Sequence, residues 1–238
     1  MIPHSFFGRI TKKPAVTSII IALLCIVIGA VSFIFLFDSI REQNDIARLD
    51  NPTLMWFVSH RSGSLTVIIK LITTMASPVV LGSLVAVASL IWAVKKREIW
   101  RPALLMGAMG LAVAMSTTIK LLVGRGRPPL ADMIPPFEVD YSFPSGHTLG
   151  IAVLVLVAGY LVYSRRPTKQ RLILWITVTI LGIGLIAMSR LYLAYHWVTD
   201  IGASLGLSLV VFGLVIIIDT LRLNFRLQSK KALSSIDQ

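Results

Sequence analysis

Charged side chains are scarce in this sequence. Asp, Glu, Lys and Arg together make up 14% of the 238 residues, whereas 55% of the residues are hydrophobic and the mean hydropathy is +0.81. Water-soluble domains carry about 25% charged residues, so these values lie far outside their range. The scarcity of charge excludes a soluble protein and indicates an integral membrane protein.

Cysteine and acidic residues are also few. Cys25 is the one cysteine and lies within a hydrophobic run, which excludes an intramolecular disulfide framework and a cysteine-based zinc site. The 11 acidic residues are outnumbered by 23 basic ones, and the net charge is +12. The basic residues form short clusters beside apolar runs and do not follow one face, as they would in a nucleic-acid-binding protein. They indicate membrane topology and a few site residues, with membrane lipids and no nucleic acid as partners.

Long hydrophobic runs are what the sequence has in abundance. Thr17 to Phe37 is uninterrupted for about 21 residues, enough to cross a hydrocarbon core of ~30 Å as a helix. A secretory signal would have a shorter apolar segment and a cleavage site of small residues, so we interpret this run as a retained span. We predict a single all-α membrane domain over residues 1–238, with a basic cytoplasmic tail at 219–238. The expected spans are residues 17–37, 65–94, 102–123, 147–163, 172–188 and 201–218.

The second predicted span is unusual in its length. The run at 65–94 is longer than one span needs. We therefore expect Pro78 to kink a single helix, and the ammonium group of Lys70 to reach the outer interface. Before this run, the apolar stretch Leu54 to Val58 with Trp56 is typical of a short helix that lies in the interface.

Lysine and arginine are distributed unevenly between alternate connections. Fifteen fall in the N-terminus, the basic turns at 95–101 and 164–171, and the tail, against six in the three opposite connections. Connections rich in these residues remain in the cytoplasm. We therefore expect a multi-pass protein of the plasma or inner membrane with both termini in the cytoplasm and the opposite connections on the outer side.

Three polar clusters interrupt the apolar runs where the predicted spans reach the outer side. The first follows the third span and holds Lys120, Arg125 and Arg127, beside glycines and prolines that would end the helix. Cations in an outer connection run against the usual charge bias. We interpret this cluster as part of a site, and a solvated basic loop is the alternative.

The second cluster, Pro144-Ser145-Gly146-His147, opens the fourth span. Ser145 can cap the helix, and Gly146 lets the backbone approach a ligand. A helix N-terminus favours bound anions, and His147 would lie beside such an anion. Taken alone this pattern is weak, because a single interfacial histidine is more often without function.

The third cluster joins the fifth and sixth spans and contains Arg190, His196 and Asp200. His196 and Asp200 are four residues apart and share a face if the segment is helical. The carboxylate could then accept the Nδ1 proton, which leaves the Nε2 lone pair free to act as a nucleophile. The alternative is a carboxylate that only caps the helix.

These residue types suit phosphoryl transfer through a covalent phosphohistidine. His196 would attack phosphorus, His147 would protonate the departing oxygen, and Lys120, Arg127 and Arg190 would stabilise charge on the equatorial oxygens. The clusters hold only one acid with ligand spacing, and the sequence has no His-Glu-x-x-His or Asp-rich grouping. We therefore expect no metal and no cofactor.

The three clusters together resemble the signature of the type 2 phosphatidic acid phosphatase (PAP2) superfamily. The matching segments are Lys120-x6-Arg127-Pro128, Pro144-Ser145-Gly146-His147 and Ser189-Arg190-x5-His196-x3-Asp200. The resemblance implies a six-span, metal-independent lipid phosphatase with His196 as nucleophile, Asp200 as its orienting carboxylate and His147 as general acid. It also implies that the other signature residues bind phosphate: Lys120, Arg127, Ser145, Gly146 and Arg190.

The resemblance does not select one substrate. Bacterial membrane members of this superfamily most often act on undecaprenyl diphosphate, phosphatidylglycerophosphate or phosphatidic acid. The small size and bacterial-looking plan of the chain favour undecaprenyl diphosphate. Two alternatives are transfer of the phosphoryl group to another lipid and a non-catalytic protein that binds lipid phosphates, although the latter would be expected to have lost one of its histidines.

Overall fold

The fold is a bundle of helices, seen in a computed structural model that describes residues 12–44 and 46–236. Every regular element within these residues is helical. The elements are α1 (Lys12–Glu42), η1 (Ala47–Leu49), α2 (Asp50–Ser59), α3 (Gly63–Met75), α4 (Pro78–Lys96), α5 (Trp100–Val123), α6 (Gly146–Tyr163), α7 (Lys169–Tyr192) and α8 (Val198–Ile236). Six of them, α1, α4, α5, α6, α7 and α8, are long and apolar enough to cross a membrane. The predicted all-α, six-span architecture is confirmed.

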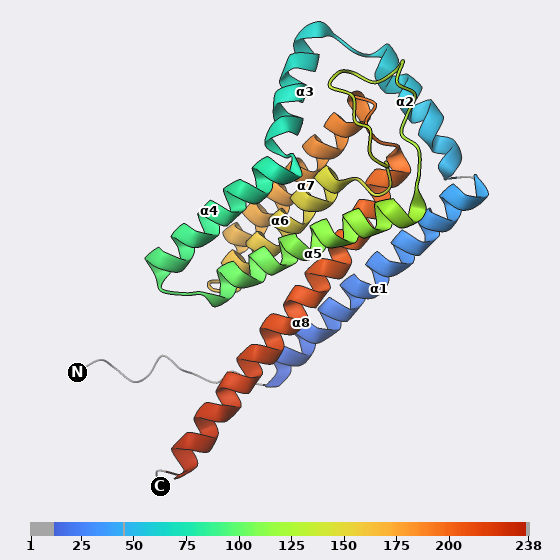
Figure 1. Cartoon of the computed structure of the whole chain (residues 1–238). Coiled ribbons are helices and arrows are strands. Elements are labelled where there is room, and N and C mark those ends of the chain that lie inside the picture. Colours follow the sequence, from blue (N-terminus) through green and yellow to red (C-terminus); the bar gives the residue numbers. More distant parts are fainter. Residues whose placement is uncertain (1–11, 45, 237–238) are drawn as a thin grey trace.

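Helices α1 and α8 share the most extensive contact in the bundle and lie side by side in Figure 1. Glycine makes this possible. A Cβ atom built on Gly206 would lie 2.7 Å from the carbonyl oxygen of Gly29, and one on Gly29 would lie 2.4 Å from the carbonyl oxygen of Gly206. In a lipid environment, where lipid tails are as apolar as side chains, close backbone packing of this kind holds helices together.

The prediction of one kinked span over 65–94 is wrong, because this run forms two helices, α3 and α4. The backbone of Ser77 is extended, and its hydroxyl accepts a hydrogen bond from the N–H of Val80 at 3.4 Å. Pro78 occupies the first turn of α4, where its missing N–H costs nothing. The serine and proline therefore end one helix and start the next, and the 13 residues of α3 are too few to span a membrane.

The end of the chain also differs from the prediction. The helix does not end with the predicted span at residue 218, because residues 219–236 continue α8, and the cytoplasmic location expected for residues 219–238 stays a prediction. At the start of this continuation, the carboxylate of Asp219 accepts hydrogen bonds from the Trp100 indole N–H at 2.8 Å and from the Tyr160 hydroxyl at 3.1 Å. The residue that would have opened a solvated tail is thereby bound to α5 and α6.

The polar connections gather at the two ends of the bundle. The chain between α5 and α6, helix α2 and the α7–α8 join lie together at one end (Figure 1). The turn between α4 and α5 and the turn between α6 and α7 lie apart from this end. Residues of both turns line one groove, among them Lys95, Lys96, Arg165 and Arg166. Between these ends α6 and α8 supply much of the core, and Val153, Val157 and Leu161 of α6 are fully buried.

Candidate active site

A cavity of about 640 Å³ opens between α4, α5 and α6 at the end of the bundle that carries the three polar clusters. Its polar part is lined by Lys120, Arg127, Glu138, Asp140, His147 and His196. Its other wall is apolar and comes mainly from α4 and α5, with Leu81, Met106, Met109 and Val113 among the lining residues. The cavity therefore joins a charged end to a hydrophobic wall.

The end of α5 delivers the first cluster to this cavity. Gly124 adopts a left-handed conformation with φ of 63°, and its N–H donates to the carbonyl of Lys120 at 3.0 Å. This glycine cap ends the helix, as the sequence predicted. Lys120 stays in the last helical turn, while Arg127 follows on the loop and turns back to the same cavity.

The start of α6 delivers the second cluster. Ser145 is fully buried and is the N-cap, its hydroxyl accepting a hydrogen bond from the N–H of Thr148 at 3.4 Å. Gly146 and His147 form the first turn and line the cavity. The predicted cap is confirmed, and it sets His147 at the helix end that favours an anion.

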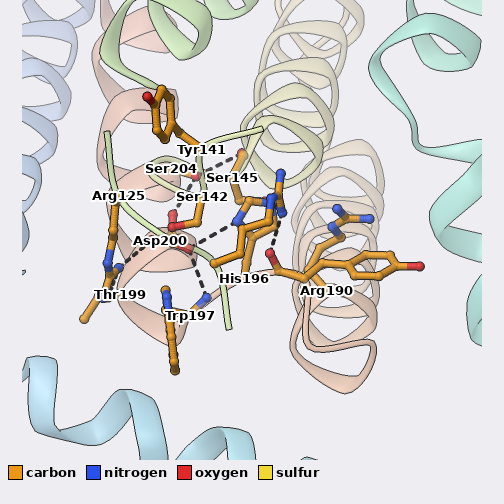
Figure 2. A network of polar contacts seen from close by, with 12 residues as sticks. Arg125, Tyr141, Ser142, Ser145, Arg190, His196, Trp197, Thr199, Asp200 and Ser204 are labelled. Carbon is orange, nitrogen blue, oxygen red and sulfur yellow. Dashed lines mark hydrogen bonds and ion pairs between the residues drawn. The ribbon is translucent and has the colours of Figure 1, made fainter. Parts of the chain in front are cut away.

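The join between α7 and α8 holds the third cluster. His196 precedes α8, and its Nδ1 lies 3.2 Å from Oδ2 of Asp200 in the first helical turn. The same carboxylate oxygen accepts the backbone N–H of Trp197 at 3.0 Å (Figure 2). Asp200 thus caps the helix and contacts the imidazole at once, so the two roles weighed from the sequence are compatible.

The contacts of His196 define its tautomer. An Nη1–H of Arg127 lies 3.3 Å from Nε2, and because a guanidinium can only donate, Nε2 must be the unprotonated acceptor. Nδ1 then carries the proton and donates it to Asp200. Burial, and after it the positive charges of Arg127 and Arg190, hold the pKa of His196 well below its ordinary value. This shift favours the neutral ring, in which the unprotonated Nε2 is on the side of Arg127 and the cavity.

Asp200 owes its charge to a buried network that the sequence did not reveal. Nη1 of Arg125 donates to Asp200 at 2.5 Å and to Thr199 at 2.7 Å (Figure 2). Nη2 of the same side chain donates to Asp50 at 2.5 Å. Asp50 also accepts from the N–H of Thr199 at 3.0 Å. A fully buried carboxylate needs such a partner to remain ionised. Arg125, the remaining cation of the first polar cluster, therefore lies beside Asp200 and Asp50.

Two further acidic residues were not singled out from the sequence, although both lie just before the second cluster. Glu138 pairs with Arg190 and, at 2.8 Å, with Arg127. Asp140 pairs with Arg127 and, at 3.0 Å, with Lys120. Burial opposes ionisation of Asp140, but its hydrogen bond from Lys120 and the charge of Arg127 outweigh burial and place its pKa below the ordinary value.

The eight predicted site residues are divided into two shells. Lys120, Arg127, Gly146, His147 and His196 line the cavity, whereas Ser145, Arg190 and Asp200 lie behind its wall. Arg190 is 1% exposed, donates to the Thr73 hydroxyl at 2.8 Å and reaches the cavity through Glu138. In the part of the chain that the structure describes, no three His, Cys, Asp or Glu side chains gather as the ligands of a metal ion would.

The fold and the cavity together define an integral membrane protein of six helical spans with a pocket of histidines and cations at one end of its bundle. Residues 101–223 match the family model of the PAP2 superfamily, and the chain belongs to this superfamily.

One curated protein and one solved structure, both from Bacillus subtilis, resemble this chain. The chain is 30% identical over 121 residues to phosphatidylglycerophosphatase B of strain 168, a match that covers 50% of this chain and 58% of that protein, little more than half its length. The fold resembles a crystal structure described as the first transmembrane PAP2 type phosphatidylglycerolphosphate phosphatase from Bacillus subtilis. The TM-score is 0.74 and the identity 24%, over 82% of this chain and 95% of that one. At this identity the likeness concerns the fold.

Proposed function

We propose that this chain hydrolyses a lipid phosphate through a phosphohistidine on His196. The observation that carries the proposal is the cavity itself, in which two histidines and two cations lie at the end of an apolar wall formed by α4 and α5. A lipid phosphate matches this cavity, because it is charged at one end and apolar along the rest of its length. Membership of the PAP2 superfamily agrees with this chemistry.

The proposed reaction has two steps. In the first, Nε2 of His196 attacks phosphorus, the new N–P bond replaces the P–O bond to the lipid, and His147 gives a proton to the departing lipid oxygen. In the second, His147 takes a proton from water, which attacks phosphorus and releases inorganic phosphate and free His196. Lys120 and Arg127 stabilise the negative charge on the equatorial oxygens in both steps.

The role of Asp200 follows from its contacts. As His196 forms its bond to phosphorus, positive charge develops on the ring, and the carboxylate at 3.2 Å from Nδ1 stabilises that charge. The backbone bond from Trp197 and the ion pair with Arg125 hold the carboxylate in one position. His196 is thereby oriented before the substrate arrives.

Among the candidate lipids, phosphatidylglycerophosphate takes first place in this proposal because the matched relative is a phosphatidylglycerophosphatase. The expectation of undecaprenyl diphosphate rested on chain size and plan alone, and it stays a prediction to be tested. Both lipids carry a phosphate on an apolar body, so the cavity accommodates the chemistry of either.

A panel of lipid phosphates tests the function and the substrate together. Purified protein with excess EDTA is expected to release inorganic phosphate from phosphatidylglycerophosphate faster than from phosphatidic acid or undecaprenyl diphosphate. Since the proposal gives attack, proton transfer and charge stabilisation all to side chains, the chelator should leave the rates unchanged. Release from none of the lipids would contradict the proposal, and phosphate appearing on a second lipid instead of in water would identify a phosphotransferase.

We also infer that the cavity opens at the outer surface of the membrane, from the asymmetry of fifteen against six Lys and Arg residues. The two basic turns that line a common groove, 95–101 and 164–171, would then face the cytoplasm.

Cysteine labelling tests this orientation. In a Cys25→Ala background, Asp132→Cys on the α5–α6 connection is expected to react with an impermeant thiol reagent added to intact cells. Lys169→Cys, at the start of α7, should react only after the membrane is permeabilised. The opposite pattern would place the cavity on the cytoplasmic side.

A further inference from the structure

The cations of the cavity are already occupied by the protein's own carboxylates. Glu138 bridges Arg127 and Arg190, and Asp140 bridges Arg127 and Lys120. These three cations are the groups assigned above to the charge on the substrate phosphate, either directly or from behind the cavity wall. Carboxylate and phosphate oxygens make the same charge-assisted hydrogen bonds to guanidinium and ammonium groups. A phosphate that enters the cavity therefore competes with two carboxylates for the same donors.

The three cations and the two carboxylates differ sharply in exposure. The side chains of Lys120, Arg127 and Arg190 are 13%, 6% and 1% exposed, whereas those of Glu138 and Asp140 are 24% and 61% exposed. The cations are thus fixed in the protein, while the carboxylates reach them from the solvent side of the loop. A carboxylate in that position can turn outward to water at a small cost in solvation when another anion replaces it.

The loop that carries the two carboxylates does not depend on them for its position. The backbone carbonyl of Asp140 accepts from Nε of Arg127 at 2.7 Å, and that of Tyr141 accepts from Lys120. Ser142 donates its N–H to the carbonyl of Arg125 at 2.9 Å and its hydroxyl to that of Gly126 at 3.0 Å. Exchange of the acidic side chains for amides therefore leaves the loop anchored.

We propose that Glu138 and Asp140 act as an internal anion that lowers the affinity of the cavity for phosphate, so that a phosphate without a lipid tail binds weakly. The proposal rests on the function proposed above. Free phosphate gains only the contacts to the cations and must displace the carboxylates to make them. A lipid phosphate makes the same exchange but also buries its tail along the apolar wall of α4 and α5. The carboxylates lower both affinities by the same exchange, so that only a phosphate whose tail adds binding free energy occupies the cavity, and the free phosphate product is released.

Direct binding of inorganic phosphate tests this proposal without relying on turnover. The full-length protein in detergent is titrated with phosphate by calorimetry. Asp140→Asn is expected to bind phosphate about fivefold more tightly than wild type, the range of a partly exposed ion pair. Glu138→Gln should also bind more tightly, and the double variant most tightly. Asp132→Asn, on the same loop, is the matched control: it removes one negative charge without touching the three cations, and its affinity should equal that of wild type.

Each other outcome has a distinct meaning. Phosphate affinity that is unchanged or weaker in both amide variants, with wild type binding phosphate and Lys120→Gln losing it, would overturn the role of the carboxylates and leave the proposed function in place. An equal gain in Asp132→Asn would reduce the effect to net charge and also overturn it. Binding that is absent in every variant, or insensitive to Lys120→Gln, would overturn the phosphate pocket and with it the proposed function.

Discussion

His196→Ala is expected to abolish the covalent intermediate and to lower turnover by at least ~10⁴-fold, the scale seen when a nucleophile is removed from an enzyme. In wild type, rapid quenching without acid during turnover of a ³²P-labelled lipid should trap a phosphoenzyme that is stable to alkali and labile to acid. The expectation follows from the position of His196, whose unprotonated Nε2 faces the cavity while Nδ1 is held by Asp200.

His60→Ala is the matched control. His60 is exposed, stacks on Trp56 at the end of α2 and does not line the cavity. Its loss should leave turnover and labelling unchanged. A labelled enzyme that survives His196→Ala would contradict the assignment of the nucleophile.

The other histidine should respond to the chemistry of the leaving group. His147→Ala is expected to form the phosphoenzyme slowly from a lipid monophosphate, whose alkoxide needs a proton, and to be much less impaired with an aryl phosphate, whose phenolate needs little help. An equal loss for both leaving groups would remove His147 from the role of general acid. A lipid diphosphate releases a lipid phosphate, which is also a weaker base than an alkoxide and needs less help from an acid. The size of the defect with each lipid therefore bears on the natural substrate.

Asp200→Asn is expected to lower turnover by roughly 10⁴-fold, as when the orienting aspartate of a serine protease triad is made neutral. The amide keeps the size of the side chain and can still accept the N–H of Trp197. It lacks the negative charge that stabilises a positive ring on His196, and it loses its ion pair with Arg125. Inorganic phosphate should still bind, since Lys120 and Arg127 are untouched. Single-turnover kinetics would measure the loss of turnover, and calorimetry would measure phosphate binding separately.

Asp50→Asn provides a graded comparison. Asp50 shares Arg125 with Asp200 but contacts neither His196 nor the cavity. Its loss is expected to lower turnover by about 10–100-fold, the usual cost of a supporting residue one step from the chemistry. Turnover of Asp200→Asn within tenfold of wild type would show that this carboxylate is only a helix cap.

The features that the sequence predicted correctly are local ones. Gly124 ends α5 and Ser145 begins α6 because a left-handed glycine and a buried hydroxyl satisfy backbone groups only a few residues away. His196 and Asp200 meet because four residues separate them. Spacing along the chain is enough to predict such contacts.

The errors came from two places where a local pattern had two solutions. A proline within a long apolar run can kink a helix or begin one. Here the backbone of Ser77 is extended, so a new helix begins at Pro78. A polar residue after a span can enter water or find a partner in the bundle. Asp219 accepts hydrogen bonds from Trp100 and Tyr160 inside the bundle, and α8 extends beyond it.

The sequence by itself determined the membrane class, the number of spans and the residues of the three clusters, because hydropathy and motif spacing depend only on order along the chain. Only the tertiary structure decided which cations face the cavity and which stand behind it. Arg125 meets Asp50 across 75 positions of sequence, and Arg190 meets Glu138 across 52. A buried charge needs an oppositely charged partner, and the packing of the helices decides which residue lies close enough to be that partner. Such long-range pairs leave no periodic pattern in the sequence.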